Sequence, residues 1–268
     1  MTVYVLPVVI ALFVWWFSTG VVLMLDRMPR RTHYISQMVA TVLALGSFYV
    51  LIKSTSEPTT MAAYQAFVAA ILIWGWHELA FLLGILTGPR PMPCPEGANT
   101  SKRFLYAVKA LAYHELAILA TLVLIWIISK DEANQVGFWT FLVLFGMRLS
   151  AKLNIFLGVP YINEEFLPTH LEFLKSYFAR RAMNWLFPIS VTVSTLLGAY
   201  IFHAAFLTAE KEFEIVSYML IGTFVLLGML EHWLLILRIP DSALWTWAMK
   251  LTPNNDKTDT KIARYQEP

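Results

Sequence analysis

Residues 61–86 read MAAYQAFVAAILIWGWHELAFLLGIL, an apolar run with His77 and Glu78 deep inside it. At a rise of 1.5 Å per residue, a helix of this length crosses the ~30 Å hydrocarbon core of a bilayer. Ionisable groups at that depth cost roughly 3 kcal/mol each on translocon-based scales, so they need partners and a purpose. The run therefore predicts a transmembrane helix that carries a functional polar pair.

Six further stretches of the 268-residue chain are long and apolar enough to span a membrane: 3–25, 35–53, 104–129, 136–158, 184–207 and 214–238. The composition agrees, because 58% of the residues are hydrophobic and only 14% are charged, well below the charged share of soluble domains. We expect an all-α polytopic membrane protein, with a seven-helix transmembrane domain over residues 1–240 and a cytoplasmic tail over 241–268.

The basic residues predict how the helices are oriented. They gather on one predicted side of the membrane, in the segments 27–31, 90–103, 175–181 and 250–264. The other side holds only Lys53, Lys130 and Lys211. Because cytoplasmic loops carry the excess of Lys and Arg, we expect the N-terminus to face out and the C-terminus to face the cytoplasm.

Two segments outside the spans have distinct patterns. In the segment 159–183, apolar residues recur at helical spacing from Pro168 onward, which suits a helix lying in the membrane interface as a lid over the cytoplasmic mouth of the bundle. The tail from Asn254 to Pro268 is polar and aperiodic, so we expect part of it to be disordered.

Several classes of function are excluded. The net charge of +2 mainly reflects the cytoplasmic bias of the basic residues, and it indicates no nucleic-acid partner. The chain has neither a Walker loop nor a G-x-G-x-x-G motif, so no nucleotide is expected. Cys94 is the single cysteine, which excludes an internal disulfide and a cluster of four cysteine ligands.

A polar layer is predicted inside the membrane. The phrase His-Glu-Leu-Ala occurs twice, beginning at His77 and at His114. Because their helices run in opposite directions, both histidines lie about 14–15 Å from the cytoplasmic ends of their helices. On two other helices, Arg148 and the pair Glu231-His232 reach the same level. Four helices should therefore deliver polar groups to one layer.

The charges of this layer do not balance. Glu78, Glu115 and Glu231 supply three potential negative charges, whereas Arg148 and Lys152 supply two positive ones. Unpaired charge at this depth costs several kcal/mol, but paired groups inside a bundle are tolerated. A proton, a cation or a cationic partner would neutralise the remaining negative charge.

Six residues of the layer have side chains that bind Zn, Fe or Mn, namely His77, Glu78, His114, Glu115, Glu231 and His232. Helical bundles build di-metal sites from inward-facing Glu and His. The spacing does not match the usual motif, since Phe81 and Ile118 stand where H-E-x-x-H needs its second histidine. The alternative is a structural hydrogen-bond network in which Arg148 binds a carboxylate.

Two tryptophans suggest a third use for the layer. Trp74 and Trp76 flank His77 on its N-terminal side and, together with Arg148, can line a cavity for a flat conjugated ligand such as a bacteriochlorophyll-type pigment. Ordinary packing of the indole rings is the alternative. A proton relay through the ionisable groups would instead fit a channel or carrier.

Longer stretches resemble a known family. They are GMRLSAKLNIFLGVP from Gly146, NEEFLP from Asn163, MNWLFP from Met183 and the two His-Glu-Leu-Ala phrases. This pattern resembles the PuhE family, the photosynthetic complex assembly protein 2 of purple and related phototrophic bacteria, over nearly the whole membrane region. The resemblance implies a protein of the inner membrane, including its intracytoplasmic photosynthetic part, that supports normal levels of reaction-centre or light-harvesting complexes.

Our leading hypothesis is a membrane factor that assists assembly of the photosynthetic apparatus by binding a reaction-centre or antenna subunit, or a pigment, within the bilayer, in contact with membrane lipid. The alternative is an intramembrane metalloenzyme, an oxidoreductase or hydratase, that acts on a tetrapyrrole or isoprenoid through the His and Glu residues of the layer. The resemblance brings neither a catalytic mechanism nor a ligand assignment.

Overall fold

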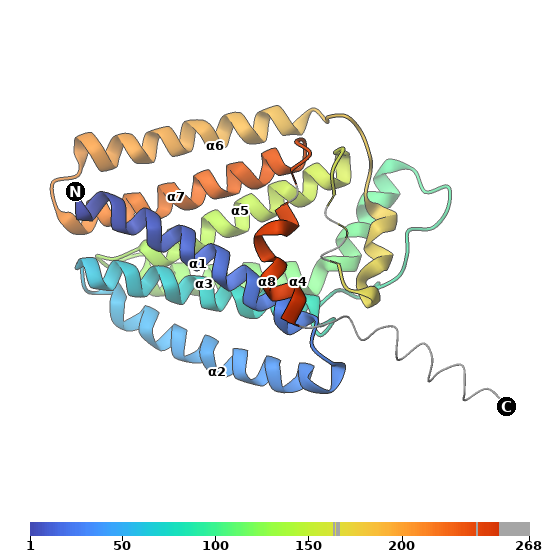
Figure 1. Ribbon diagram of the computed structural model, residues 1–268, viewed down its shortest axis with the longest axis horizontal. Helices are drawn as coiled ribbons and strands as arrows, with labels where there is room; N and C mark the ends of the chain where they lie inside the picture. Colours follow the sequence, from blue (N-terminus) through green and yellow to red (C-terminus); the bar gives the residue numbers. More distant parts are fainter. Residues whose placement is uncertain (163, 165–166, 240, 252–268) are drawn as a thin grey trace.

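The computed structural model describes residues 1–162, 164, 167–239 and 241–251 (Figure 1). Helices are the only regular secondary structure of the described residues, and seven of these helices are long and apolar enough to cross a membrane. They are α1 (Thr2–Asp26), α2 (Arg30–Thr55), α3 (Thr60–Leu82), α4 (Thr100–Ser129), α5 (Val136–Leu157), α6 (Leu186–His203, continued by the π-helix η3, Ala204–Thr208) and α7 (Glu212–Leu234). The all-α, seven-helix prediction is confirmed. The tail from Asn254 lies outside the described residues.

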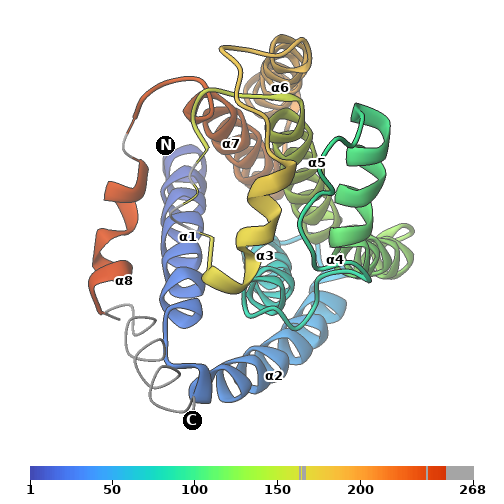
Figure 2. The same ribbon diagram turned by 90° about the vertical axis from the view of Figure 1, so that its right-hand side faces the viewer.

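Helices α3 and α7 form the centre of the bundle. In the most apolar stretch of α3, 56% of the residues are buried, and in that of α7, 67% are buried. In the corresponding stretches of the other five helices, at most 28% are buried. Small residues such as Ala63, Ala66 and Ala70 allow close helix approach, and the rings of Phe67 and Phe224 meet edge to face at 4.8 Å between centroids. Helix α2 covers the outer side of α3, and α6 covers that of α7 (Figures 1 and 2).

The outer helices present apolar side chains on their outward faces. Val42 and Leu45 on α2 are 69% and 65% exposed, and Leu196 on α6 is 66% exposed. Contiguous exposed apolar surface on this scale suits lipid rather than water. The protein is therefore a multi-pass membrane protein.

Helix α3 ends earlier than the sequence indicated. It stops at Leu82, not at Leu86, because Gly84 takes a φ of +74° and the N–H groups of Ile85 and Leu86 both donate to the carbonyl of Ala80. A positive φ suits glycine, so the chain turns here. The turn leads residues 85–88 back against α4.

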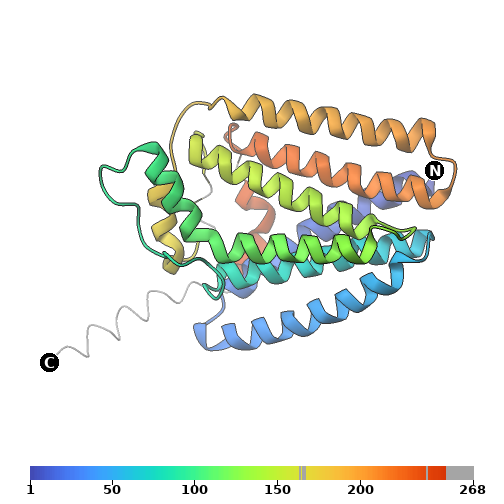
Figure 3. The same ribbon diagram turned by 180° about the vertical axis from the view of Figure 1, so that it is seen from behind.

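Helix α4 is bent (Figures 2 and 3). The backbone N–H of His114 donates to the carbonyl of Thr87 at 2.9 Å, which is a bond to a neighbouring segment. A Cβ at Gly88 would lie 2.6 Å from the carbonyl carbon of Ala110 and closer still to the carbonyl oxygen of Lys109. A segment that intrudes on a helix backbone produces a kink, so we attribute the bend to this contact.

The segment 159–183 contains the predicted helix, in a tighter form. Residues Thr169–Tyr177 form the 3₁₀-helix η2, which lies across one end of the bundle (Figure 2). Its buried residues Leu171, Leu174 and Tyr177 pack with Phe81 of α3 and Ala110 of α4. The sequence pattern identified this helix, and its role as a lid stays a prediction.

The start of the tail folds back on α1. Residues Asp241–Trp245 form the 3₁₀-helix η4, and Thr246–Leu251 form α8. The indole N–H of Trp245 donates to the carbonyl of Trp16 at 2.9 Å, and that of Trp16 donates to the carbonyl of Leu244 at 2.8 Å. This docking was not predicted.

Candidate functional site

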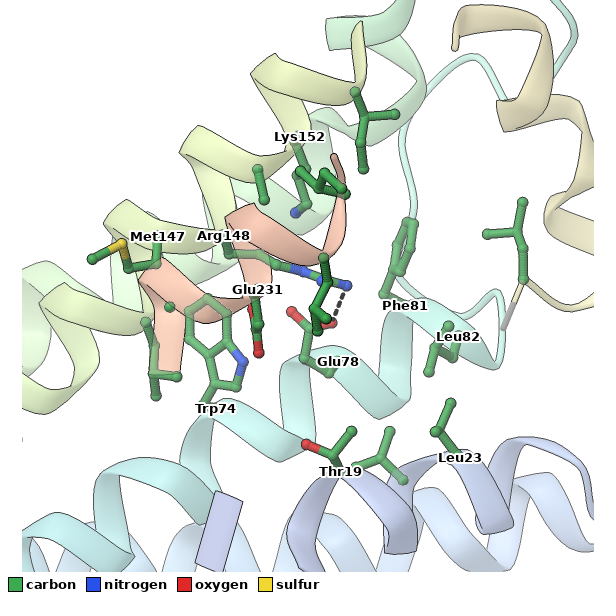
Figure 4. Close-up of a pocket in the computed structure, with 18 of the residues that line it drawn as sticks. Thr19, Leu23, Trp74, Glu78, Phe81, Leu82, Met147, Arg148, Lys152 and Glu231 are labelled. Carbon is green, nitrogen blue, oxygen red and sulfur yellow. Dashed lines mark hydrogen bonds and ion pairs between the residues drawn. The ribbon is translucent and has the colours of Figure 1, made fainter. Parts of the chain in front are cut away.

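A cavity of about 440 Å³ lies inside the bundle (Figure 4). Residues of α1, α3, α4, α5 and α7 line it, and Leu174 and Tyr177 of η2 line it at the end of the bundle. Most of the wall is apolar, as Ile71, Val143 and Phe224 illustrate. Four charged residues of the predicted layer also line it, namely Glu78, Arg148, Lys152 and Glu231.

Arg148 on α5 forms an ion pair with Glu78 on α3 across the cavity wall. The Nη2 atom of Arg148 lies 3.4 Å from Oε2 of Glu78 (Figure 4). The Glu78 side chain is 13% exposed, whereas the Arg148 side chain is 46% exposed and extends along the cavity. The contact between Arg148 and a carboxylate, one of the alternatives raised by the sequence, is therefore present.

Lys152, one turn further along α5, binds a different carboxylate. Its Nζ lies 2.5 Å from Oε1 of Glu115 on α4. Lys152 lines the cavity, but Glu115 is not among the lining residues. The two basic residues of α5 therefore pair with different glutamates: Arg148 with Glu78 on α3, and Lys152 with Glu115 on α4.

Glu231 on α7 has a neutral partner. Its Oε1 accepts a hydrogen bond from the indole N–H of Trp15 on α1 at 3.0 Å. Within the described part of the chain, no Lys, Arg or His nitrogen lies within 4.0 Å of its carboxylate. Glu231 is therefore the carboxyl group of the layer that has no basic partner among the described residues.

His77 and His114 are not among the residues that line the cavity. Nε2 of His77 lies 2.9 Å from Oγ1 of Thr121 on α4, and its Nδ1 has no hydrogen-bond partner among the described residues. His114 is fully buried with its ring 4.6 Å from that of Phe81, and neither ring nitrogen has a partner in that part of the chain. The two histidines thus join α3 to α4 beside the cavity.

His232 belongs to a separate network. Its Nδ1 lies 2.7 Å from the carbonyl of Gly228, so Nδ1 carries the proton, because a carbonyl only accepts. Its Nε2 lies 2.8 Å from the Ser150 hydroxyl, which is 2.9 Å from the Ser190 hydroxyl. The Asn154 amide donates to Ser190 at 3.1 Å. These contacts join α5, α6 and α7.

Comparison with known proteins assigns the chain to a family. Residues 1–256 match the family described as "Protein of unknown function (DUF3623)". The chain belongs to the DUF3623 family. It is 40% identical over 243 residues to an "Uncharacterized 30.4 kDa protein in puhA 5'region" of Rhodobacter capsulatus, which covers 89% of this chain and 88% of that protein. No solved structure matches.

The two predicted cavity tryptophans of this DUF3623 protein have different environments. Trp74 lines the cavity and packs edge to face against Phe141, with 5.3 Å between ring centroids. Trp76 instead donates from its indole N–H to Oγ1 of Thr41 on α2 at 2.9 Å, and it is not among the lining residues. Adjacent helix positions point about 100° apart, and two positions along about 200° apart, which accounts for the divergence.

The six predicted metal ligands of the DUF3623 chain divide among separate contacts. Glu78 binds Arg148, Glu115 binds Lys152, and His232 binds Ser150. Among the residues that the structure describes, no group of three or more His, Cys, Asp or Glu side chains is arranged to hold a metal ion. The metal site stays a prediction.

Sequence reasoning missed several residues of the site. Trp15, Thr19 and Trp245 all line the cavity, although they lie on the first helix and in the tail. Trp15 and Trp245 pack against each other at 5.4 Å between ring centroids. The sequence signal was the density of Trp at positions 15, 16, 245 and 247, which an aromatic belt at the membrane interface explains equally well.

Proposed function

We propose that this protein assists assembly of the bacterial photosynthetic apparatus, the reaction-centre or light-harvesting complexes, from within the inner membrane and its intracytoplasmic photosynthetic part. Two findings support a photosynthetic role. The Rhodobacter capsulatus relative is described by its position 5' of puhA. The stretch GMRLSAKLNIFLGVP, which begins at Gly146 on α5, resembles the PuhE family. The assembly step itself is our inference.

The cavity supports a role in holding a ligand during that assembly. Small-molecule sites have volumes of roughly 300–1,000 Å³, apolar walls and a few placed polar groups. The cavity of about 440 Å³ has these properties, with Glu78, Arg148 and Glu231 as the polar groups. A whole transmembrane helix of a partner is far larger, so a compact ligand suits the cavity, and a partner subunit would bind the outer helix faces.

Affinity purification from phototrophic cells tests this function. The tagged protein would be extracted in mild detergent, and its co-eluting polypeptides and absorption spectrum would be recorded. We expect reaction-centre or antenna subunits, or a bacteriochlorophyll-type pigment, to co-elute. An unrelated tagged multi-pass protein expressed in the same cells is the control. If the eluate contains neither pigment nor photosynthetic subunits above that control, the proposed function is wrong.

A second candidate function, an intramembrane metalloenzyme acting on a tetrapyrrole or isoprenoid, rests on one observation. Buried atoms without hydrogen-bond partners among the described residues concentrate on the two His-Glu-Leu-Ala phrases: Nδ1 of His77, Oε1 of Glu78 and both ring nitrogens of His114. Buried polar atoms need partners, and a metal ion or a water molecule would supply them. Metal analysis of wild type and His114→Ala tests it, because a metalloenzyme would lose its bound metal in the variant.

A further inference from the structure

Glu231 is the carboxyl group of the cavity wall that has no basic partner within 4.0 Å among the described residues. The other two carboxylates at the cavity each have a basic group within 4.0 Å, since Glu78 pairs with Arg148 and Glu164 pairs with Arg180. From the residues that the structure describes, Glu231 receives only the neutral indole N–H of Trp15, on Oε1. Its second oxygen, Oε2, has no hydrogen-bond partner within the described residues.

The basic residues nearby are already engaged. Arg148 attracts Glu231 electrostatically, but its guanidinium forms its ion pair with Glu78 (Figure 4). Lys152 binds Glu115. A carboxylate in an apolar wall at membrane depth is stabilised by a cation or by a hydrogen-bond donor that reaches its free oxygen.

The rest of the cavity defines the other part of a ligand. Trp74 and Phe224 offer aromatic surface, and Val143 and Leu227 offer aliphatic surface, all lining the same space as Glu231. Such a wall favours an apolar body of a single chain or ring system. A ligand that satisfies both parts of the cavity has one positively charged end and one apolar body.

We propose that the cavity binds a cationic amphiphile, whose protonated amine pairs with Glu231 while its apolar body lies between α1, α3, α5 and α7. The Glu78–Arg148 and Glu115–Lys152 pairs remain intact in this complex, so they contribute no net charge. An anionic amphiphile would be repelled by the Glu231 carboxylate and would have to share Arg148 with Glu78, and a neutral one would leave the Glu231 carboxylate uncompensated. This inference rests on the cavity being the working site of the proposed function.

Photoaffinity labelling tests the proposal directly. The full chain is placed in nanodiscs of phosphatidylcholine and labelled with dodecylamine that carries a diazirine on its alkyl chain. The labelled residues are mapped by mass spectrometry. Excess unlabelled dodecylamine, dodecanol or dodecanoate then competes, and the three competitors share the same chain length. We expect cavity residues such as Thr19, Met147 and Leu227 to be labelled.

The competitors should differ in effect. Dodecylamine should suppress cavity labelling at concentrations about tenfold below those that dodecanol needs. A tenfold difference in affinity is the smallest that we expect from one charge-assisted hydrogen bond. Dodecanoate should be the weakest. Equal competition by dodecanol or dodecanoate would overturn the proposal, and this comparison needs no variant of the protein.

A matched pair of variants locates the charge. Glu231→Gln keeps the shape of the side chain and should reduce cavity labelling about tenfold, because a charge-assisted bond becomes a neutral one. Glu132→Gln, in the exposed turn after α4, should label like wild type. Unchanged labelling of Glu231→Gln would show that the carboxylate is already protonated and would overturn the proposal. Co-purification with photosynthetic subunits does not enter this test, so the two proposals can fail separately.

Discussion

The indole N–H of Trp15 on α1 donates to the Glu231 carboxylate on α7 at 3.0 Å, and this bond joins the first and last spanning helices at the wall of the cavity. Trp245, from the start of the tail, packs edge to face on the same Trp15 ring. Residues separated by more than two hundred positions thus meet at the one cavity carboxylate whose charge has no close basic partner among the described residues.

Trp15→Phe tests this contact. The substitution keeps most of the ring volume and removes the N–H, so we expect a loss of stability of about 1–2 kcal/mol from the missing bond to a charged acceptor. Thermal unfolding in detergent measures it. Trp185→Phe is the control, because Trp185 is 67% exposed and should tolerate the change. Equal unfolding temperatures for Trp15→Phe and wild type would show that the bond contributes nothing.

The ion pair between Glu78 and Arg148 should behave as a unit. Arg148→Met leaves the Glu78 carboxylate uncompensated in a mostly apolar wall, and we expect a destabilisation of about 2 kcal/mol, tempered because Arg148 is half-exposed to the cavity. Glu78→Gln together with Arg148→Met should recover most of that loss, because it removes the unpaired charge. Unfolding measurements on the two single variants and the double variant give the coupling. Strictly additive losses would contradict the pair.

The polar layer was predictable only in part. Hydropathy located the seven spans because roughly twenty apolar residues in a row leave few alternatives. Counting residues from the helix ends also placed Glu78, Arg148 and Glu231 at one depth in the membrane. In the structure, these three residues line one cavity. The individual partners were beyond that reasoning. Whether His77 contacts Thr121 depends on helix rotation, which a pattern along one helix does not define.

Two features of the fold had no usable sequence signal. Helix α3 was predicted to reach Leu86, because residues 83–86 are apolar and only Gly84 marks the turn at a φ of +74°. The docking of η4 and α8 on α1 was missed because a helix of six residues carries too little periodicity to recognise. The sequence therefore predicted Trp245 as part of a tail, whereas in the structure it lines the cavity.

Gly88 should be essential for the bend of α4. Gly88→Ala would place a Cβ 2.6 Å from the backbone carbonyl carbon of Ala110, and backbone atoms yield little. We expect a destabilisation of about 1–3 kcal/mol, the usual range for overpacking. The control is Gly46→Ala on α2, where no heavy atom lies within 4 Å of the added Cβ and alanine favours the helix. Thermal unfolding of both variants checks the difference, and similar stability would refute tight contact at Gly88.

Trp245 should restrict access to the cavity from the α1 side. Trp245→Ala removes a buried ring that lines the cavity, so a cysteine placed at Thr19 in a Cys94→Ser background should react faster with a small maleimide. Trp185→Ala in the same background should leave the rate unchanged. If Trp245→Ala also leaves it unchanged, Trp245 does not close the cavity.

The orientation of the helices predicts where Cys94 lies. Cys94, between α3 and α4, should react with a membrane-impermeant maleimide in inside-out vesicles and not in intact spheroplasts, because the distribution of basic residues predicts a cytoplasmic location for this loop. A Cys94→Ser, Glu132→Cys variant should show the reverse pattern, since residue 132 follows α4 at its other end. Labelling of Cys94 in intact spheroplasts would contradict the predicted topology and indicate the opposite orientation.

The most direct test of the account is the near-infrared absorption of membranes from phototrophic cells that carry wild type, a deletion, Glu231→Gln or Glu132→Gln as the only copy of this protein. We predict that Glu231→Gln lowers the absorbance of the assembled reaction-centre and antenna complexes as far as the deletion does, with normal amounts of the variant protein in the membrane, while Glu132→Gln matches wild type. Normal absorbance in the Glu231→Gln membranes would contradict a role for the charged cavity in photosynthetic assembly.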